Sequence, residues 1–258
     1  MTLTLSGAPL VAYLLASVRL VAWLVVAPPF STRAVPVLVK TLLAAGMSLA
    51  VVPTMHGLSR VQVPDDAFAL GESALQEALI GASLGFVMFL VFSAVEAAGN
   101  LVDVFGGFSL AAAFDPLNQN MNSVHGKLFS MLATMLLFTS GAYLLVVGGV
   151  LRSFDQMPVG AAWHPAGTAE VVTTALGMFF SAAVQIALPL IAVLFLADLG
   201  LALLTRVAPQ LNAIGIMFPA KIGLTLLMVG MSFAVLPDAM RRLLETMSQA
   251  MSALLGGG

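Results

Sequence analysis

Long apolar stretches determine the solvent in which this chain folds. A helix needs about 20 mostly apolar residues to cross a bilayer, and stretches near that length recur between turn signals. They lie at residues 8–27, 37–52, 74–98, 128–151, 171–197 and 211–236. Because a segment in lipid must satisfy its own backbone hydrogen bonds, these six stretches predict an all-α integral membrane protein. We expect residues 1–258 to form a single membrane domain.

The chain carries too little charge for a soluble domain. Lys and Arg number 10 and Asp and Glu 12, so charged residues make up 9% of the 258 positions, against about a quarter in soluble domains. Hydrophobic residues make up 60%. A soluble enzyme is therefore excluded, and without a basic run to bind phosphates, nucleic acid is not expected as a partner.

Cofactor and catalytic chemistry have no pattern to support them. The chain has no Cys, which excludes disulfides, thiolate catalysis and Cys-ligated metals. Its three His residues, His56, His125 and His164, have no companions at ligand spacing. A phosphate-binding Gly-rich loop and a partnered catalytic set are both lacking. We therefore expect no metal, no cofactor and no enzymatic activity.

Basic residues do not determine the orientation in the membrane. When the nine Lys and Arg other than Arg19 are assigned to the connections on alternate sides, they divide as five against four. A simple bundle of spans shows a clearer bias. Either partners set the orientation, or some stretches are not ordinary bilayer spans.

Several charges lie inside or at the margins of the apolar stretches, where lipid disfavours them by several kcal/mol unless they are paired or hydrated. Glu96, Asn100 and Asp103 fall on one face of a continuous helix. This face is either neutralised by Arg or Lys from a neighbouring helix or in contact with a transported species. The charged residues are Arg19, Lys40, Glu96, Asp103, Asp198 and Lys221.

Residues 106–122 form the most unusual stretch. It begins with Gly106 and Gly107, continues with apolar residues, and breaks at Asp115 and Pro116 into an uncharged Asn-rich run. The residue before proline disfavours helix, and Asp and Asn favour turns. Irregular backbone at membrane depth must be buried in protein or line a cavity. The stretch is therefore either a loop that lines or blocks a pore or a surface loop between two spans.

A C-terminal segment at residues 240–255 has an amphipathic pattern. Leu243, Met247 and Met251 recur at helical spacing, with Arg241 and Arg242 among them. Such a helix either docks against a partner helix or lies in the membrane interface.

Three blocks of sequence occur in a fixed order. The first is Ala-Pro-Pro-Phe-Ser-Thr-Arg-Ala-Val-Pro-Val-Leu-Val-Lys at residues 27–40. The second combines residues 79–85 with Glu96, Gly99, Gly107, Ser109, Asp115 and Pro116. The third contains Asp-Leu-Gly-Leu at residues 198–201, Arg-Val-Ala-Pro-Gln-Leu-Asn at residues 206–212 and Phe-Pro-Ala-Lys at residues 218–221. Together the blocks resemble the FliR/SctT family of type III export-gate proteins, and FliR of the flagellum more than SctT of the injectisome.

The resemblance implies a non-enzymatic core subunit of the type III protein export gate. Bent helical hairpins would stack with FliP-like and FliQ-like subunits into a closed helical assembly, with FlhB and FlhA nearby. The assembly would lie in the bacterial inner membrane at the flagellar basal body, project towards the periplasm, and pass unfolded flagellar proteins. We expect buried-charge and assembly roles for Arg19, Arg33, Lys40, Glu96, Asp103, Asp198, Arg206, Gln210, Asn212 and Lys221.

The family also has a plug loop, which matches residues 106–122 here. Narrow apolar constrictions resist wetting, so we expect Phe108, Leu110, Phe114 and Leu117 to seal the pore. Family members commonly carry Gln-Met before the glycine at Gly107, where this chain has Phe-Gly. The plug and pore candidates are Gly106, Gly107, Phe108, Ser109, Leu110, Phe114, Asp115, Pro116, Leu117 and Asn118.

A secondary transporter of a small solute is the alternative. Pro189 and Pro219 interrupt the fifth and sixth apolar stretches, and broken helices with buried charges are typical of such carriers. A transporter is expected to bind a solute as a monomer or homodimer, whereas a gate subunit is expected to be unstable without its partner subunits.

Overall fold

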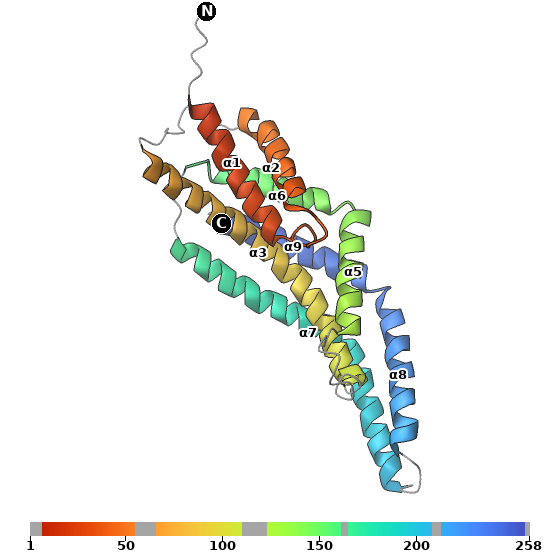
Figure 1. Cartoon of the computed structure of the whole chain (residues 1–258). Helices are drawn as coiled ribbons and strands as arrows, with labels where there is room; N and C mark the ends of the chain where they lie inside the picture. The colour runs from red at the N-terminus through yellow and green to blue at the C-terminus, as the bar shows by residue number, and fades with distance from the viewer. Residues whose placement is uncertain (1–6, 55–65, 110–122, 161–164, 208–212, 256–258) are drawn as a thin grey trace, which may run out of the picture. The chain divides into compact units, whose positions relative to one another are not determined.

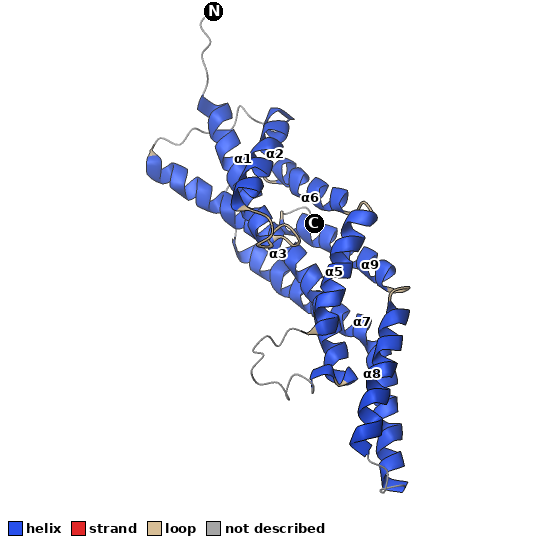
Figure 2. Ribbon diagram, turned by 45° about the vertical axis from the view of Figure 1, so that its right-hand side comes forward, coloured by secondary structure: helices blue, strands red, loops and turns tan. Residues whose placement is uncertain are grey.

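Helices make up the regular structure of this protein. The computed structural model describes residues 7–54, 66–109, 123–160, 165–207 and 213–255. Within these ranges no strand occurs, and the regular structure is helical (Figure 2). The elements are α1 (Gly7–Val26), α2 (Val37–Val51), the 3₁₀ turn η1 (Val52–Thr54), α3 (Ala67–Gly106), α5 (Val124–Thr139), α6 (Tyr143–Gln156), α7 (Pro165–Val207), α8 (Ala213–Ser232) and α9 (Leu236–Leu254) (Figure 1).

Three of the described helices, α1, α3 and α7, are long and apolar enough to cross a membrane. The pairs α5 with α6 and α8 with α9 are each interrupted by a short break, and counting each pair as one span gives up to five. α2 has 15 residues and is shorter than a full span. The prediction of an all-α membrane protein is confirmed.

The fourth apolar stretch differs from its prediction as one continuous segment. α5 ends at Thr139 and α6 begins at Tyr143, inside predicted residues 128–151. Gly141, between them, has a φ of +72°, which lies in the left-handed region that glycine enters without steric cost. The apolar composition continues through this break, so hydropathy alone did not reveal it.

α3 and α7 run beyond the apolar stretches that predicted them. α3 has 40 residues and α7 has 43, and α7 continues through Pro189. Membrane helices tolerate proline because neighbouring groups satisfy the freed carbonyl. The contacts of the chain divide it into two compact units. The first comprises Met1–Leu90, Gly141–Leu176 and Glu245–Gly258, and the second comprises Val91–Ser140 and Gly177–Leu244.

In the first unit, α1 lies beside α2 and packs closely on α3 (Figure 1). A Cβ atom at Gly81 would overlap the backbone carbonyl of Arg19, and one at Gly85 would lie 3.0 Å from the carbonyl oxygen of Trp23. The two glycines therefore let the helix backbones approach. Apolar side chains fill the space around this crossing, among them Leu15, Leu20, Trp23, Leu84, Val87 and Phe154.

In the second unit, the C-terminal part of α3 packs on the start of α5. A Cβ atom at Gly99 would overlap the backbone carbonyl of His125, and one at Gly126 would overlap the side-chain oxygen of Asn100. Here too, glycine brings two backbones together. The buried apolar side chains include Val95, Ala98, Val102, Phe129, Ala133 and Leu137.

α7 exposes much of its apolar surface. In its most apolar 18-residue window only 17% of the residues are buried, against 61% in the corresponding window of α3. Phe180 is 75% exposed and Leu196 is 64% exposed. An apolar surface of this extent requires lipid or another protein to cover it.

Candidate functional site

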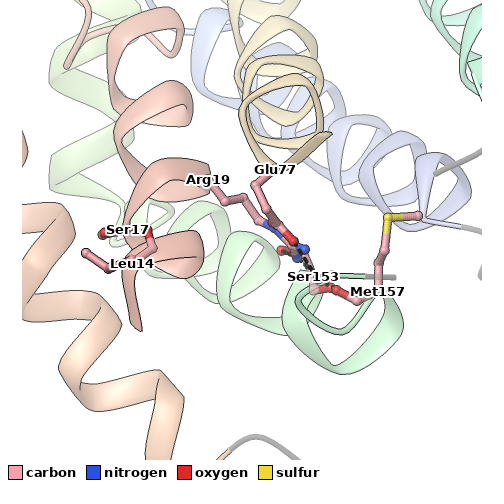
Figure 3. Close-up of polar contacts among 7 residues, drawn as sticks. Leu14, Ser17, Arg19, Glu77, Ser153 and Met157 are labelled. Atoms are coloured by element: carbon pink, nitrogen blue, oxygen red, sulfur yellow. Dashed lines mark hydrogen bonds and ion pairs between the residues drawn. The ribbon is translucent and has the colours of Figure 1, made fainter. Parts of the chain in front are cut away.

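A buried ion pair lies inside the first unit. The Nε atom of Arg19 in α1 donates to Oε2 of Glu77 in α3 over 2.6 Å (Figure 3). Neither side chain is more than 2% exposed. Because both charges are removed from solvent, each depends on the other for compensation.

Further polar groups complete the Arg19 network, defined as Arg19, Glu77, Ser153, Met157 and Gly160. The Nη1 atom of Arg19 donates to the carbonyl oxygens of Ser153 over 3.2 Å and of Met157 over 3.0 Å. Oε1 of Glu77 accepts from the backbone N–H of Gly160 over 3.0 Å. The network therefore ties α1 and α3 to the end of α6 and the turn that follows it (Figure 3).

Sequence reasoning singled out Arg19 but missed Glu77. The sequence did contain a signal for this pair. Glu77 is an acidic residue inside the apolar stretch at residues 74–98, and Arg19 is a basic residue inside the stretch at residues 8–27 that could neutralise it. The carbonyl acceptors of Ser153 and Met157 gave no signal, because every residue has a carbonyl.

A second polar cluster lies in the second unit and joins α3 to the start of α5. This Asp103 cluster consists of Asp103, Ser123 and His125. The Ser123 hydroxyl donates to Oδ2 of Asp103, which also accepts from the backbone N–H of His125 over 3.1 Å. The Nδ1 atom of His125 contacts Oδ1 of the same carboxylate. Asp103 is 5% exposed and His125 is 2% exposed.

Ser123 also caps α5, because its hydroxyl oxygen accepts from the backbone N–H of Gly126 over 2.8 Å. A serine at this position satisfies one of the free N–H groups of the first helical turn. The carboxylate of Asp103 therefore holds the cap itself in place.

The described part of the predicted plug begins beside this cluster. The ring of Phe108 meets the ring of His125 edge-on, with centroids 4.7 Å apart. Gly107 has a φ of +84°, which ends α3 at a left-handed residue. The hydroxyl of Thr225 donates to the carbonyl of Lys221 over 2.8 Å, and its oxygen also lies 3.4 Å from the carbonyl oxygen of Gly106.

The three residues of the acidic face predicted on α3 differ in their exposure to solvent. Glu96 and Asn100 are exposed, whereas Asp103 is buried under the first residues of α5. The carboxylate of Asp103 contacts a histidine instead of the Arg or Lys that charge neutralisation suggested. Sequence reasoning treated His125 as isolated, because its partner lies 22 residues away in the chain.

Asp198 and Lys221 form an ion pair between α7 and α8. The Nζ atom of Lys221 lies 2.7 Å from the carboxylate of Asp198, and the side chains are 18% and 39% exposed. The buried Lys40 donates to the carbonyl of Thr32 over 3.4 Å.

The remaining predicted residues fall into two groups. Arg33, Ser109 and Arg206 are exposed. The others lie outside the described residues, and they are Leu110, Phe114, Asp115, Pro116, Leu117, Asn118, Gln210 and Asn212.

The described side chains offer little for catalysis. Ser123, His125 and Asp103 are the residue types of a hydrolase triad, but the Ser123 hydroxyl donates to the carboxylate and not to the imidazole. Among the described residues, no three His, Asp or Glu side chains are placed to hold a metal ion. The buried polar groups instead tie helices together.

The fold and these buried ties define a class: an α-helical membrane protein whose charges join helix to helix inside it. The chain belongs to the family described as "Bacterial export proteins, family 1", which matches residues 10–247. This result confirms the predicted membership of the FliR/SctT family.

Relatives from both flagellar and secretion systems share most of the chain's length. The flagellar biosynthetic protein FliR of Escherichia coli is 34% identical, over 78% of this chain and 76% of the relative. FliR of Bacillus subtilis is 28% identical, over 95% and 94%. The Yop proteins translocation protein T of Yersinia pestis is 31% identical, over 83% and 82%.

Proposed function

We propose that this protein is a non-enzymatic core subunit of the flagellar type III protein export gate. It would form part of a closed pore through which unfolded flagellar proteins leave the cell. The observation that carries the proposal is similarity to FliR proteins from two bacteria, over 95% of the chain for Bacillus subtilis and 78% for Escherichia coli. The similarity is not restricted to one part of the chain, because 95% of the chain aligns with the Bacillus subtilis relative.

The partners proposed are FliP-like and FliQ-like gate subunits, with FlhB and FlhA nearby. The assembly would lie in the inner membrane at the basal body and project towards the periplasm. The exposed apolar surface of α7 supports the proposal that other proteins cover this subunit. Contact with other subunits would also explain why Lys and Arg counts do not orient the chain.

We propose further that residues 106–122 are the plug of this pore. Phe108, Leu110, Phe114 and Leu117 would seal it against ions, because an apolar constriction resists wetting. The ends of the stretch support this role. Gly107, with a positive φ, follows the end of α3, and Ser123 caps the start of α5.

Complementation and assembly test the gate function together. Expressed in a flagellated bacterium that lacks its own FliR, the chain should restore motility. Native mass spectrometry of the coexpressed complex should show it bound to FliP-like and FliQ-like chains in unequal ratio. A stable monomer or homodimer that binds a small solute would instead support the transporter alternative.

Conductance tests the plug. The assembled gate is reconstituted in planar bilayers in potassium chloride, with and without residues 106–122. We expect the deletion to raise the closed-state conductance several-fold. An unchanged conductance in a deletion complex of normal composition would exclude the plug role.

A further inference from the structure

The described residues that precede and follow residues 110–122 contact one another. At the start of the stretch, the Phe108 ring packs edge-on against His125. At its end, Ser123 and His125 both contact the carboxylate of Asp103. Asp103 itself lies on α3, less than one helical turn before Gly106, where α3 ends. One buried carboxylate therefore connects the helix that leads into the stretch with the residues that follow it.

We infer that Asp103 is a positioning residue that fixes the base of the plug, an inference that rests on the plug function proposed for residues 106–122. Both carboxylate oxygens are occupied, with the Ser123 hydroxyl and the His125 N–H on Oδ2 and the imidazole on Oδ1. A helix cap alone would need only the Ser123 oxygen, which already accepts from Gly126. The carboxylate adds a connection from α5 back to α3.

Burial makes this connection strong. Asp103 and His125 are at most 5% exposed, and hydrogen bonds to an ionised group are worth more in such surroundings than in water. If the carboxylate is removed, the Ser123 hydroxyl and the His125 ring lose their acceptor inside the protein, which costs more than the loss of an exposed contact.

We expect a fixed base to limit how far the proposed plug can extend. A loop whose ends are joined extends no further than about half of its contour length, and closing it restricts the conformations that it samples. With its base fixed, the proposed plug starts and ends at one place. With its base released, the start of α5 can separate from α3, and the proposed plug is no longer held at that place.

The first test compares conductances of the fully assembled gate in planar bilayers in potassium chloride. We expect Asp103→Ala and the double variant Ser123→Ala/His125→Ala each to raise the closed-state conductance by most of the increase that deletion of residues 106–122 produces. The matched control is Thr134→Ala, which removes a hydroxyl that bonds within α5 to the carbonyl of Ser130. This control should conduct as the unaltered gate does.

A reversible cross-link separates positioning from folding. The chain has no Cys, so Asp103→Cys/Ser123→Cys introduces the only two thiols in the subunit. The complex is assembled and oxidised, and the disulfide is then reduced in the bilayer. We expect low conductance while the disulfide is intact and a several-fold rise after reduction. Ser123→Cys alone should show no change on reduction.

The outcomes distinguish the two proposals. If the deletion leaks while Asp103→Ala and the reduced double-cysteine gate conduct as the unaltered gate does, the positioning role is wrong and the plug stands. If the deletion itself does not leak, the plug function is wrong and the positioning role falls with it. If Asp103→Ala fails to assemble, the change in conductance on reducing the assembled double-cysteine gate decides alone.

Discussion

At the scale of single residues, the described ion pairs differ sharply in exposure. Arg19 and Glu77 are essentially inaccessible to solvent, whereas Asp198 and Lys221 are partly exposed. A buried charge left without its partner carries a large desolvation cost, and an exposed one is compensated by water or lipid headgroups. The two pairs should therefore respond very differently to mutation.

Arg19→Ala should lower the free energy of unfolding by about 3–5 kcal/mol, because it leaves Glu77 buried and unpaired. Thermal unfolding of the chain in its purified gate complex in detergent, followed by circular dichroism, measures the loss. The double variant Arg19→Met/Glu77→Leu removes both charges and should recover most of the stability. A double variant as unstable as Arg19→Ala would show that packing around Arg19 matters more than charge.

Lys221→Met should cost about 1 kcal/mol or less in the same measurement, because its partner Asp198 has access to solvent. Asp198→Asn provides the companion variant with nearly unchanged volume. Losses comparable to that of Arg19→Ala would mean that the pair is buried in the environment where unfolding is measured.

At the scale of elements, glycine sets how closely α1 and α3 pack. Gly81→Ala should lower the melting temperature markedly, since the added Cβ would overlap the Arg19 carbonyl and push the helices apart. Gly71 is the matched control on the same helix. No atom lies within 4 Å of a Cβ built there, so Gly71→Ala should be neutral or slightly stabilising. Equal melting temperatures for the two variants would contradict the close crossing.

The sequence predicted where apolar helices lie better than how they meet. Hydropathy located α1, α2 and α7, because burial in lipid or protein demands apolar side chains along a helix. It missed the break at Gly141, where the helix is interrupted without a change in polarity.

For the candidate site, the sequence located charges but not their partners. Arg19 stands out as a charge inside an apolar stretch, and Asp103 as one at the margin of another. Glu77 lies 58 residues from Arg19 and His125 lies 22 residues from Asp103, so only the folded chain reveals either contact. The pairing of such groups depends on tertiary structure, which no local pattern encodes.

At the scale of the whole molecule, the exposed apolar side chains of α7 give a test of assembly. A photo-reactive phenylalanine analogue placed at Phe180 or Leu196 should cross-link to neighbouring gate subunits in cells, because these side chains face away from the chain's own core. The same analogue at Leu194, which is fully buried, should cross-link only within the chain. Cross-links confined to lipid at Phe180 and Leu196 would show that α7 faces the bilayer.

The Arg19 network has a consequence for biogenesis. Ribosomes make proteins from the N-terminus, so α1 is synthesised long before its partners. Glu77 follows Arg19 by 58 residues, and the carbonyls of Ser153 and Met157 follow it by 134 and 138. Before Glu77 has been made, Arg19 has none of these partners, and before Met157 has been made its network is incomplete. A chain that stops before Glu77 therefore carries an uncompensated cation in its first helix, and one that stops before Ser153 holds Arg19 with its carboxylate partner but without the two carbonyls.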